Sequence, residues 1–136
     1  MKLEGGCYCK ELRYMAEGEP LAKAQCHCRE CQYISGGAPN IVMAMPVAGF
    51  RYTKGTPKQF TRSDLERPAT REFCANCGTH ILARVPGGPF VGLKVGTLDD
   101  PKQFGDPDMA IFLIDKQSFH RIPEGIPTFE RTPTRD

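Results

Sequence analysis

Seven cysteines are the residues of this 136-residue sequence that are best suited to chemistry. Thiolates bind soft metal ions and also take part in redox reactions. Seven is an odd number, so the cysteines cannot all pair as disulfides. The first residues lack the apolar stretch of a signal peptide, which favours a cytoplasmic location, where stable disulfides are rare. The cysteines form three groups, Cys7-x-Cys9, Cys26-x-Cys28-x-x-Cys31 and Cys74-x-x-Cys77.

The two cysteine pairs predict a structural zinc site. Such a site uses four tetrahedral ligands, and two short chelating pairs from distant parts of a chain commonly supply them. The pairs Cys7/Cys9 and Cys74/Cys77 have this arrangement. Gly78 follows the second pair and permits the sharp turn that directs backbone N–H groups toward thiolate sulfur.

The cysteine triplet predicts a different kind of site. Cys26, Cys28 and Cys31 span six residues, so they can hold one ion from a single loop. Three protein ligands leave the fourth position of a zinc ion open, and an open position distinguishes a catalytic zinc from a structural one. We therefore expect two zinc ions per chain, one of them at a catalytic site.

Other interpretations of the cysteines fit less well. A thioredoxin-like dithiol at Cys74/Cys77 requires a following helix, whereas residues 79–85 have the composition of a strand. The His-x-Glu and Pro-Cys-x-x-Cys patterns of zinc deaminases are absent from the sequence. Inert buried thiols do not explain chelating spacings.

The remaining polar residues near the cysteines have weaker signals. His27 lies between two expected ligands, where its side chain points away from the metal, so we expect it at the surface or behind the ligands. His80 and His120 are not expected to bind metal. Arg29 and Gln32 flank the triplet and either orient a substrate carboxylate and offset charge or are simply solvated.

An open three-thiolate zinc site favours sulfur chemistry. Three thiolates give the centre a net negative charge, so it activates water poorly. A soft centre of this kind instead accepts a further sulfur ligand and holds it deprotonated. The expected substrate is a small thiol or its adduct, and the expected reaction forms or breaks a carbon–sulfur bond.

Short extended segments separated by glycine and proline predict a mainly β single domain over residues 1–136, with few short helical turns. Residues 110–114 are expected to form a buried core strand. Helical turns are expected at 29–34 and at 99–104, the second capped by Thr97. The tail 131–136 is expected to fray. The expected strands are 11–16, 40–45, 50–53, 59–61, 81–85, 90–95 and 109–114.

Charge and hydropathy argue against two classes of partner. Lys and Arg number 18 and Asp and Glu 16, and the two signs are interleaved, which argues against a nucleic-acid binder. No apolar run approaches the roughly 20 residues of a membrane span. Small molecules are thus the expected partners, and the oligomeric state is left open.

Several sequence blocks resemble the glutathione-dependent formaldehyde-activating (GFA) family, whose wider membership includes centromere protein V. The blocks run through nearly the whole chain in the family's order. They are Gly6-Cys7-Tyr8-Cys9, Cys26-His27-Cys28-Arg29-Glu30-Cys31 with Gly37-Ala38-Pro39, Phe73-Cys74-Ala75-Asn76-Cys77-Gly78-Thr79, Val95-Gly96-Thr97-Leu98-Asp99-Asp100 and Glu124-Gly125-Ile126-Pro127.

The resemblance implies small antiparallel sheets around zinc, a fold called a β-tent. It also implies a structural zinc on Cys7, Cys9, Cys74 and Cys77 and a catalytic zinc on Cys26, Cys28 and Cys31. The implied activity is that of a carbon–sulfur lyase similar to S-(hydroxymethyl)glutathione synthase, which joins glutathione and formaldehyde. Membership of centromere protein V leaves a non-enzymatic zinc-stabilised binding module as the alternative.

Three positions depart from the family pattern, all outside the expected ligands. Lys10 replaces a usual glycine, Ala110 a common histidine and Phe119 a usual tryptophan. These departures bear on the identity of the thiol and the aldehyde.

Overall fold

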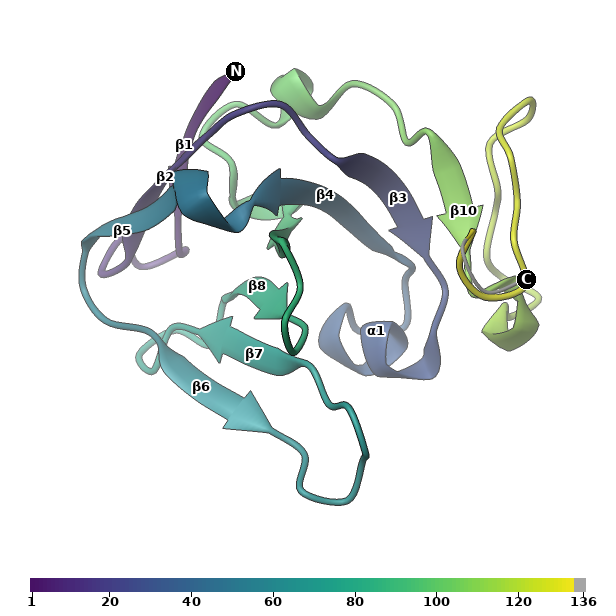
Figure 1. Cartoon of the computed structure of the whole chain (residues 1–136), viewed down its shortest axis with the longest axis horizontal. Coiled ribbons are helices and arrows are strands. Elements are labelled where there is room, and N and C mark those ends of the chain that lie inside the picture. Colours follow the sequence, from purple (N-terminus) through teal and green to yellow (C-terminus); the bar gives the residue numbers. More distant parts are fainter. Residues whose placement is uncertain (134–136) are drawn as a thin grey trace.

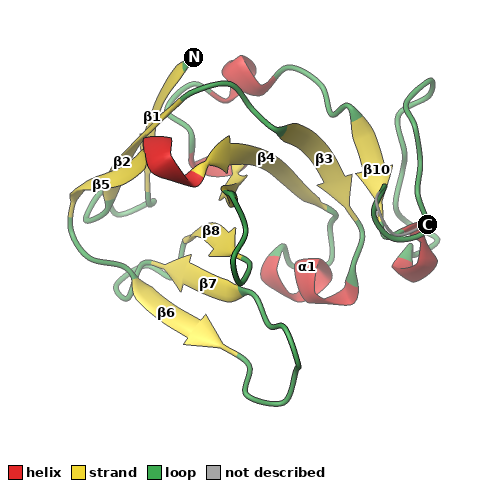
Figure 2. Ribbon diagram, viewed as in Figure 1, coloured by secondary structure: helices red, strands yellow, loops and turns green. Residues whose placement is uncertain are grey.

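Ten strands, one six-residue α-helix and four 3-10 turns make up the regular structure of residues 1–133, which are the residues described in the computed structural model (Figure 1). Loops and turns occupy much of the rest (Figure 2). The prediction of a mainly β chain with few helical turns is confirmed. In chain order the elements are β1 (Lys2–Gly6), β2 (Arg13–Glu17), β3 (Ala22–Cys26), α1 (Arg29–Ile34), β4 (Asn40–Pro46), η1 (Val47–Gly49), β5 (Phe50–Lys54), β6 (Lys58–Thr61), β7 (Thr70–Phe73), β8 (His80–Arg84), β9 (Phe90–Lys94), η2 (Val95–Thr97), η3 (Pro101–Phe104), β10 (Met109–Ile111) and η4 (Leu113–Asp115).

The strands form two sheets. The smaller has the order β1-β2-β5, and the larger has the order β10-β3-β4-β9-β8-β7-β6. The pairings are antiparallel except that β10 runs parallel to β3. Figure 1 shows α1 lying between the β3–β4 part and the β6–β7 part of the larger sheet. The larger sheet therefore wraps around the helix that carries one of the expected metal ligands.

The hydrophobic core lies where the two sheets meet. Strands alternate inward and outward residues, as in β1, where Leu3 is fully buried between two exposed neighbours. Cys7 and Cys74 belong to this core, and Cys9 and Cys77 pack against it. Its largest fully buried members are Leu3, Tyr14, Met43, Met45, Ile81, Leu82, Val91 and Leu93.

Five of the expected strands match observed ones to within about two residues, namely 40–45, 50–53, 59–61, 81–85 and 90–95. The segment 11–16 also matches to within two residues, because β2 spans Arg13–Glu17. The strands β1, β3 and β7 were not expected from the sequence. Each contains glycines or polar residues in place of an apolar run.

The expected core strand over residues 110–114 is wrong beyond Ile111. Strand β10 ends there, because Phe112 has a left-handed backbone with φ of 56°. The chain then turns into η4, and Ile114 is half exposed at 50%. Ala110 alone of this stretch is fully buried.

The helical turn at 29–34 is confirmed as α1, and that at 99–104 is confirmed in part as η3. Its cap is Asp100, whose carboxylate accepts from the backbone N–H of Lys102 at 3.2 Å, so the expected Thr97 cap is wrong. Thr97 instead donates to Lys94 O at 2.7 Å.

Two further expectations concern the chain's end and membranes. Residues 134–136 of the expected frayed tail lie outside the described residues, while the backbone oxygen of Arg131 accepts a hydrogen bond from Phe112 at 2.9 Å. Within residues 1–133, no helix approaches the length and apolar character that crossing a membrane requires.

Candidate metal centres

The two cysteine pairs come together as one cluster. Cys7 and Cys9 lie in the turn after β1, and Cys74 and Cys77 lie in the turn between β7 and β8. The four sulfur atoms are within 4.8 Å of one another. Cys9 Sγ is 3.6 Å from Cys7 Sγ and 3.7 Å from Cys74 Sγ, although 65 residues separate Cys9 from Cys74.

Backbone N–H groups point at the sulfur atoms of this four-cysteine cluster. Leu12 N–H donates to Cys7 Sγ at 3.2 Å, and Cys77 N–H donates to Cys74 Sγ at 3.5 Å. Gly78 makes the second turn possible with a φ of 78°, a value that a side chain would strain. Such N–H···S bonds stabilise thiolates, which is the form that binds metal.

Thr79 ties the two halves of the four-cysteine cluster together. Its hydroxyl accepts from the backbone N–H of Tyr8 at 3.1 Å and lies 3.1 Å from Cys77 Sγ, to which it donates. This side-chain hydrogen bond, aided by the Thr79 backbone N–H, lowers the pKa of the Cys77 thiol to about 6. One threonine thus joins the β1 turn to the β7–β8 turn.

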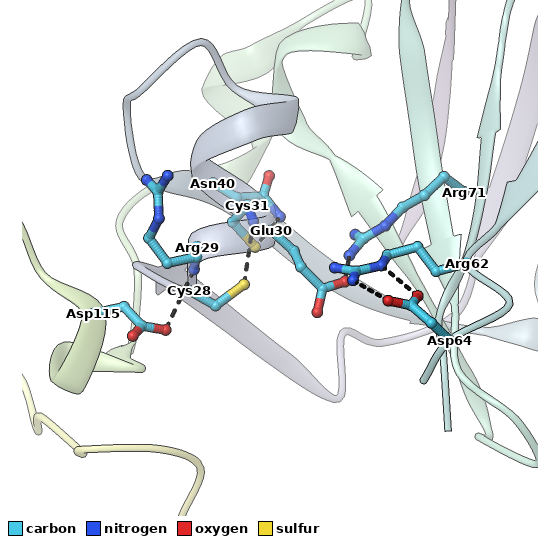
Figure 3. Close-up of polar contacts among 9 residues, drawn as sticks. All are labelled: Cys28, Arg29, Glu30, Cys31, Asn40, Arg62, Asp64, Arg71 and Asp115. Carbon is cyan, nitrogen blue, oxygen red and sulfur yellow. Dashed lines mark hydrogen bonds and ion pairs between the residues drawn. The ribbon is translucent and has the colours of Figure 1, made fainter. Parts of the chain in front are cut away.

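The cysteine triplet forms a second cluster. Cys26 ends β3, Cys28 is the N-cap residue of α1, and Cys31 lies in the helix. Their sulfur atoms are within 4.8 Å of one another, and Cys28 Sγ accepts from the Cys31 N–H at 3.2 Å (Figure 3). Asn40 lies beside the helix, with Nδ2 donating to Cys31 Sγ at 3.7 Å. Among the described residues, no fourth Cys, His, Asp or Glu joins this group.

The three-cysteine cluster favours ionisation of one thiol. Hydrogen bonds from the Cys26 and Cys28 thiols lower the pKa of Cys31 to about 3, with smaller contributions from the positive charges of Lys94 and Arg71. The same hydrogen bonding raises the pKa of Cys26. The lowered pKa of Cys31 therefore places the negative charge of the cluster on this sulfur.

A buried histidine pair supports the three-cysteine loop. Gln117 N–H donates to His120 Nδ1 at 3.1 Å, which leaves Nε2–H to donate to Gly37 O at 2.8 Å. His27 Nδ1–H donates to the same His120 nitrogen at 3.0 Å, and Gln25 Nε2 donates to His27 Nε2 at 3.1 Å. Every ring nitrogen is satisfied with both imidazoles neutral. Burial also lowers the pKa of His27.

Of the two positions expected for His27, at the surface or behind the ligands, the structure has the second, because its side chain is fully buried. Within residues 1–133, neither His80 nor His120 joins a cysteine cluster, and no sequence pattern predicts that His120 contacts His27 across 93 residues. The spacing of Cys26 and Cys28 indicates only that the side chain of His27, between them, points away from the expected metal.

The side chains of Gln32 and Arg29 make contacts within the protein that hold helix α1 in place. Gln32 is buried, and its Nε2 donates to the backbone oxygens of His27 and Asp115, each at 2.9 Å. Arg29 Nη1 donates to Gln32 Oε1 at 2.5 Å, and the guanidinium stacks over Tyr33 at 4.9 Å. Their hydrogen bonds fasten α1 to the segment that follows β10.

Two clefts lie near the three-cysteine cluster, although none of its three cysteines lines either cleft. One of about 340 Å³ lies between α1 and the β6–β7 hairpin and is mainly apolar, with Tyr33, Phe60 and Leu65 in its wall. An ion pair between Arg71 and Glu30 at 3.1 Å crosses its base (Figure 3). The second cleft, of about 350 Å³, opens on the other side of Ile34 and includes the Asn40 that contacts Cys31.

The three departures from the family pattern lie outside both clusters. Lys10 has a φ of 71°, which explains the usual glycine there. Ala110 is fully buried in β10. Phe119 is 66% exposed, and its ring centroid lies 4.9 Å from that of His120 in an edge-on arrangement.

The donor sets fit soft metal ions. Four converging sulfurs with N–H donors match a closed tetrahedral zinc site, and three converging sulfurs match a zinc site with an open position. The clusters could hold two metal ions, and zinc is consistent with sulfur ligands alone.

Comparisons with known proteins support this picture. A protein-family model described as "Glutathione-dependent formaldehyde-activating enzyme" matches residues 2–115. The crystal structure of a Rhodobacter sphaeroides protein is similar to this chain with a TM-score of 0.58 and 22% sequence identity, covering 79% of this chain and 97% of that chain. At this identity the likeness concerns the fold alone. A search among curated proteins finds no match.

Proposed function

The chain belongs to the glutathione-dependent formaldehyde-activating family, and from this membership we propose that it is a zinc-dependent carbon–sulfur lyase or synthase acting on a small thiol adduct. The observation that carries the proposal is the three-cysteine cluster. It gathers three sulfurs from one loop, has no fourth ligand among the described residues, and is separated from the second cleft by Asn40, which lines that cleft and contacts Cys31. The four-cysteine cluster is the proposed structural site.

A zinc ion held by three thiolates supplies a fourth position that prefers sulfur and keeps a bound thiol deprotonated. The chain's own residues define the surroundings of that position. Asn40 and the backbone N–H of Cys31 donate to the cluster's sulfurs and help to hold them in place. The His27–His120 hydrogen bond holds the cysteine loop on the side away from the sulfurs, so the sulfurs keep one arrangement when a ligand binds or leaves.

The proposed reaction resembles that of S-(hydroxymethyl)glutathione synthase. The thiol S–H adds across the carbonyl of a small aldehyde such as formaldehyde, so a carbon–sulfur bond forms and the proton ends on the former carbonyl oxygen. No electrons are exchanged with an oxidant or a reductant. The main contribution of the protein is to hold sulfur and carbonyl carbon together, which lowers the entropic cost of the encounter.

Exchange NMR with ¹³C-formaldehyde and glutathione tests the proposal. We expect the zinc-loaded protein to raise the rate of exchange between free formaldehyde and the adduct above the uncatalysed rate. The Cys28→Ser variant should lose this acceleration while remaining folded. Tyr8→Phe is a matched control, because Tyr8 is 90% exposed and adjoins the other cluster.

Two results would argue against the enzyme. Wild-type protein with both sites loaded and no acceleration would favour a zinc-stabilised binding module. A Cys28→Ser variant as fast as wild type would place the chemistry elsewhere.

A further inference from the structure

The second cleft lies between the two cysteine clusters. On one side Asn40 contacts Cys31 of the three-cysteine cluster. On the other side Thr79 contacts Cys77 of the four-cysteine cluster. The cleft is lined by Ile34, Ser35, Asn40, Ile41, Thr79, His80, Lys94, Val95, Gly96 and Thr97.

Two nitrogen atoms in this wall have no hydrogen-bond partner among the described residues. They are Lys94 Nζ and His80 Nδ1, and both atoms are buried. Lys94 as a whole is only 8% exposed. Burying an ammonium group or a ring nitrogen without a hydrogen-bond partner costs free energy of folding. Two such nitrogens lining one cleft therefore point to a ligand that supplies the missing partners.

Other polar side chains of the cleft are already engaged. Asn40 donates to Cys31, the Thr79 hydroxyl bridges Tyr8 and Cys77, and the Thr97 hydroxyl meets Lys94 O. Lys94 Nζ and His80 Nδ1 are therefore the buried side-chain nitrogens of the described cleft lining that remain open to a ligand.

The charges around the cleft call for an anion. No Asp or Glu lines it, and the neighbouring guanidinium of Arg71 is positive. Negative charge reaches Lys94 only through space from the cysteine thiolates, which make no hydrogen bond to it. One cation and one neutral N–H donor suit the two oxygens of a singly charged carboxylate.

We propose that this cleft binds the carboxylate of the thiol ligand, with Lys94 Nζ and His80 Nδ1–H as its donors. The inference rests on the proposed function, because the same molecule's sulfur is taken to occupy the three-cysteine cluster. Asn40 lines the cleft and contacts Cys31, so a single side chain separates the proposed carboxylate position from the three-cysteine cluster. His80 stacks on Phe73 with ring centroids 5.3 Å apart, which fixes the plane of its donor.

Two thiols that differ only at the far end test the proposal. Isothermal titration calorimetry of the zinc-loaded full chain compares 3-mercaptopropionate with 3-mercaptopropionamide. We expect the carboxylate to bind about ten- to a hundredfold more tightly, because charge-assisted hydrogen bonds are the stronger class. Equal dissociation constants for the two thiols would overturn the proposal.

Variants then assign the preference to the two nitrogens. Lys94→Met should reduce the ratio of the two dissociation constants to about one and leave amide binding unchanged. His80→Phe keeps the ring stacking and should reduce the ratio several-fold. Lys58→Met, which removes an exposed lysine of β6, is the matched control and should keep the wild-type ratio.

Zinc content distinguishes the proposal from a purely electrostatic role. If Lys94 serves only to balance the cysteine charges, Lys94→Met loses zinc from the three-cysteine cluster, and the ligand proposal fails. The proposal expects full zinc content and a melting temperature no lower than that of wild type, because an unpartnered buried charge has been removed.

Propionate and inorganic phosphate separate this proposal from the proposed function. Propionate bound in a Lys94-dependent way, without any affinity for the amide thiol, would support the cleft and contradict the thiol function. Both thiols bound equally would support a thiol site and contradict the cleft. Phosphate bound more tightly than either carboxylate would overturn the choice of carboxylate.

Discussion

The two cysteine clusters are built into different surroundings. Cys7 and Cys74 of the four-cysteine cluster belong to the hydrophobic core. The three-cysteine cluster lies outside that core, next to buried polar side chains that make hydrogen bonds to one another, to its sulfurs or to the backbone of its loop. These are Gln25, His27, Gln32, Asn40 and His120.

The difference in surroundings indicates different roles: the four-cysteine cluster stabilises the fold, and the three-cysteine cluster keeps a ligand site in place. The four-cysteine cluster joins turns that are 65 residues apart, so a metal there closes long loops of chain and stabilises the packing of both sheets. The three-cysteine cluster joins residues of one loop, so its metal adds little to the closure of the fold. Its polar neighbours instead fix where each sulfur lies.

The largest effect is expected from replacing a sulfur of the four-cysteine cluster. Structural zinc contributes about 10–16 kcal/mol in small metal-binding peptides, against a net stability of about 5–15 kcal/mol for a whole domain. Cys74→Ser should therefore give unfolded or aggregated protein, whereas Cys28→Ser should stay folded. Near-UV circular dichroism and thermal melts check this, and equal collapse of both variants would remove the distinction between the clusters.

The next effect concerns the histidine pair behind the three-cysteine cluster. His120→Phe removes the acceptor of His27 and Gln117 and the donor to Gly37, so it should cost about 2–4 kcal/mol. It should also speed the loss of zinc from the three-cysteine cluster alone, measured with a chromogenic chelator. The neighbouring exposed Phe119→Leu is the control; if it released zinc equally fast, the effect would not belong to the hydrogen bonds.

A smaller effect is expected beside the four-cysteine cluster at acid pH. Burial alone would raise the pKa of Glu72, but hydrogen bonds from Arg84, Tyr52 and Gln59 outweigh it and lower the pKa below the ordinary value of 4.5. The stabilisation is thus present above pH 4.5 and is lost as the pH falls through the lowered value.

Glu72→Gln should cost about 1–2 kcal/mol at pH 7, and the difference from wild type should shrink as the pH falls below 4.5. Urea unfolding at several pH values measures this difference. Glu17→Gln removes an exposed carboxylate 3.6 Å from Arg51 and serves as control. A difference between wild type and Glu72→Gln that stays constant with pH would contradict the assignment.

The smallest effect concerns the turn that carries Cys9. Lys10 has a left-handed backbone, which costs a residue with a side chain about 1 kcal/mol. Lys10→Gly should therefore raise the stability by up to that amount without altering the three-cysteine cluster. Chemical unfolding measures the gain, and a loss of stability would mean that the Lys10 side chain makes a larger contribution than its backbone strain removes.

The sequence was sufficient to predict the grouping of cysteines, because chelating spacings are local. It also predicted most strands of the core, where apolar residues recur. The strands β1, β3 and β7 could not be predicted, because their sequences contain no run of apolar residues. Residues 110–114 look like a core strand, but the left-handed Phe112 ends the strand early.

The polar support of the three-cysteine cluster could not be predicted from spacing. His27 and His120 meet only because β10 pairs in parallel with β3, which brings the segment after β10 next to the cysteine loop. Likewise, nothing in the sequence around Lys94 indicates that its ammonium is buried without a partner. Such features depend on contacts between residues far apart in the chain.

The position of His120 has a consequence for the order in which a growing chain can fold. The four sulfurs of the four-cysteine cluster are all present once synthesis has passed Cys77. The core strands β8 and β9 follow directly. The cysteine loop after β3 emerges early, yet its histidine partner is made 93 residues later. During synthesis the three thiols therefore form before His120 is available to hydrogen-bond to His27. This support of the cysteine loop is completed only when the segment after β10 docks.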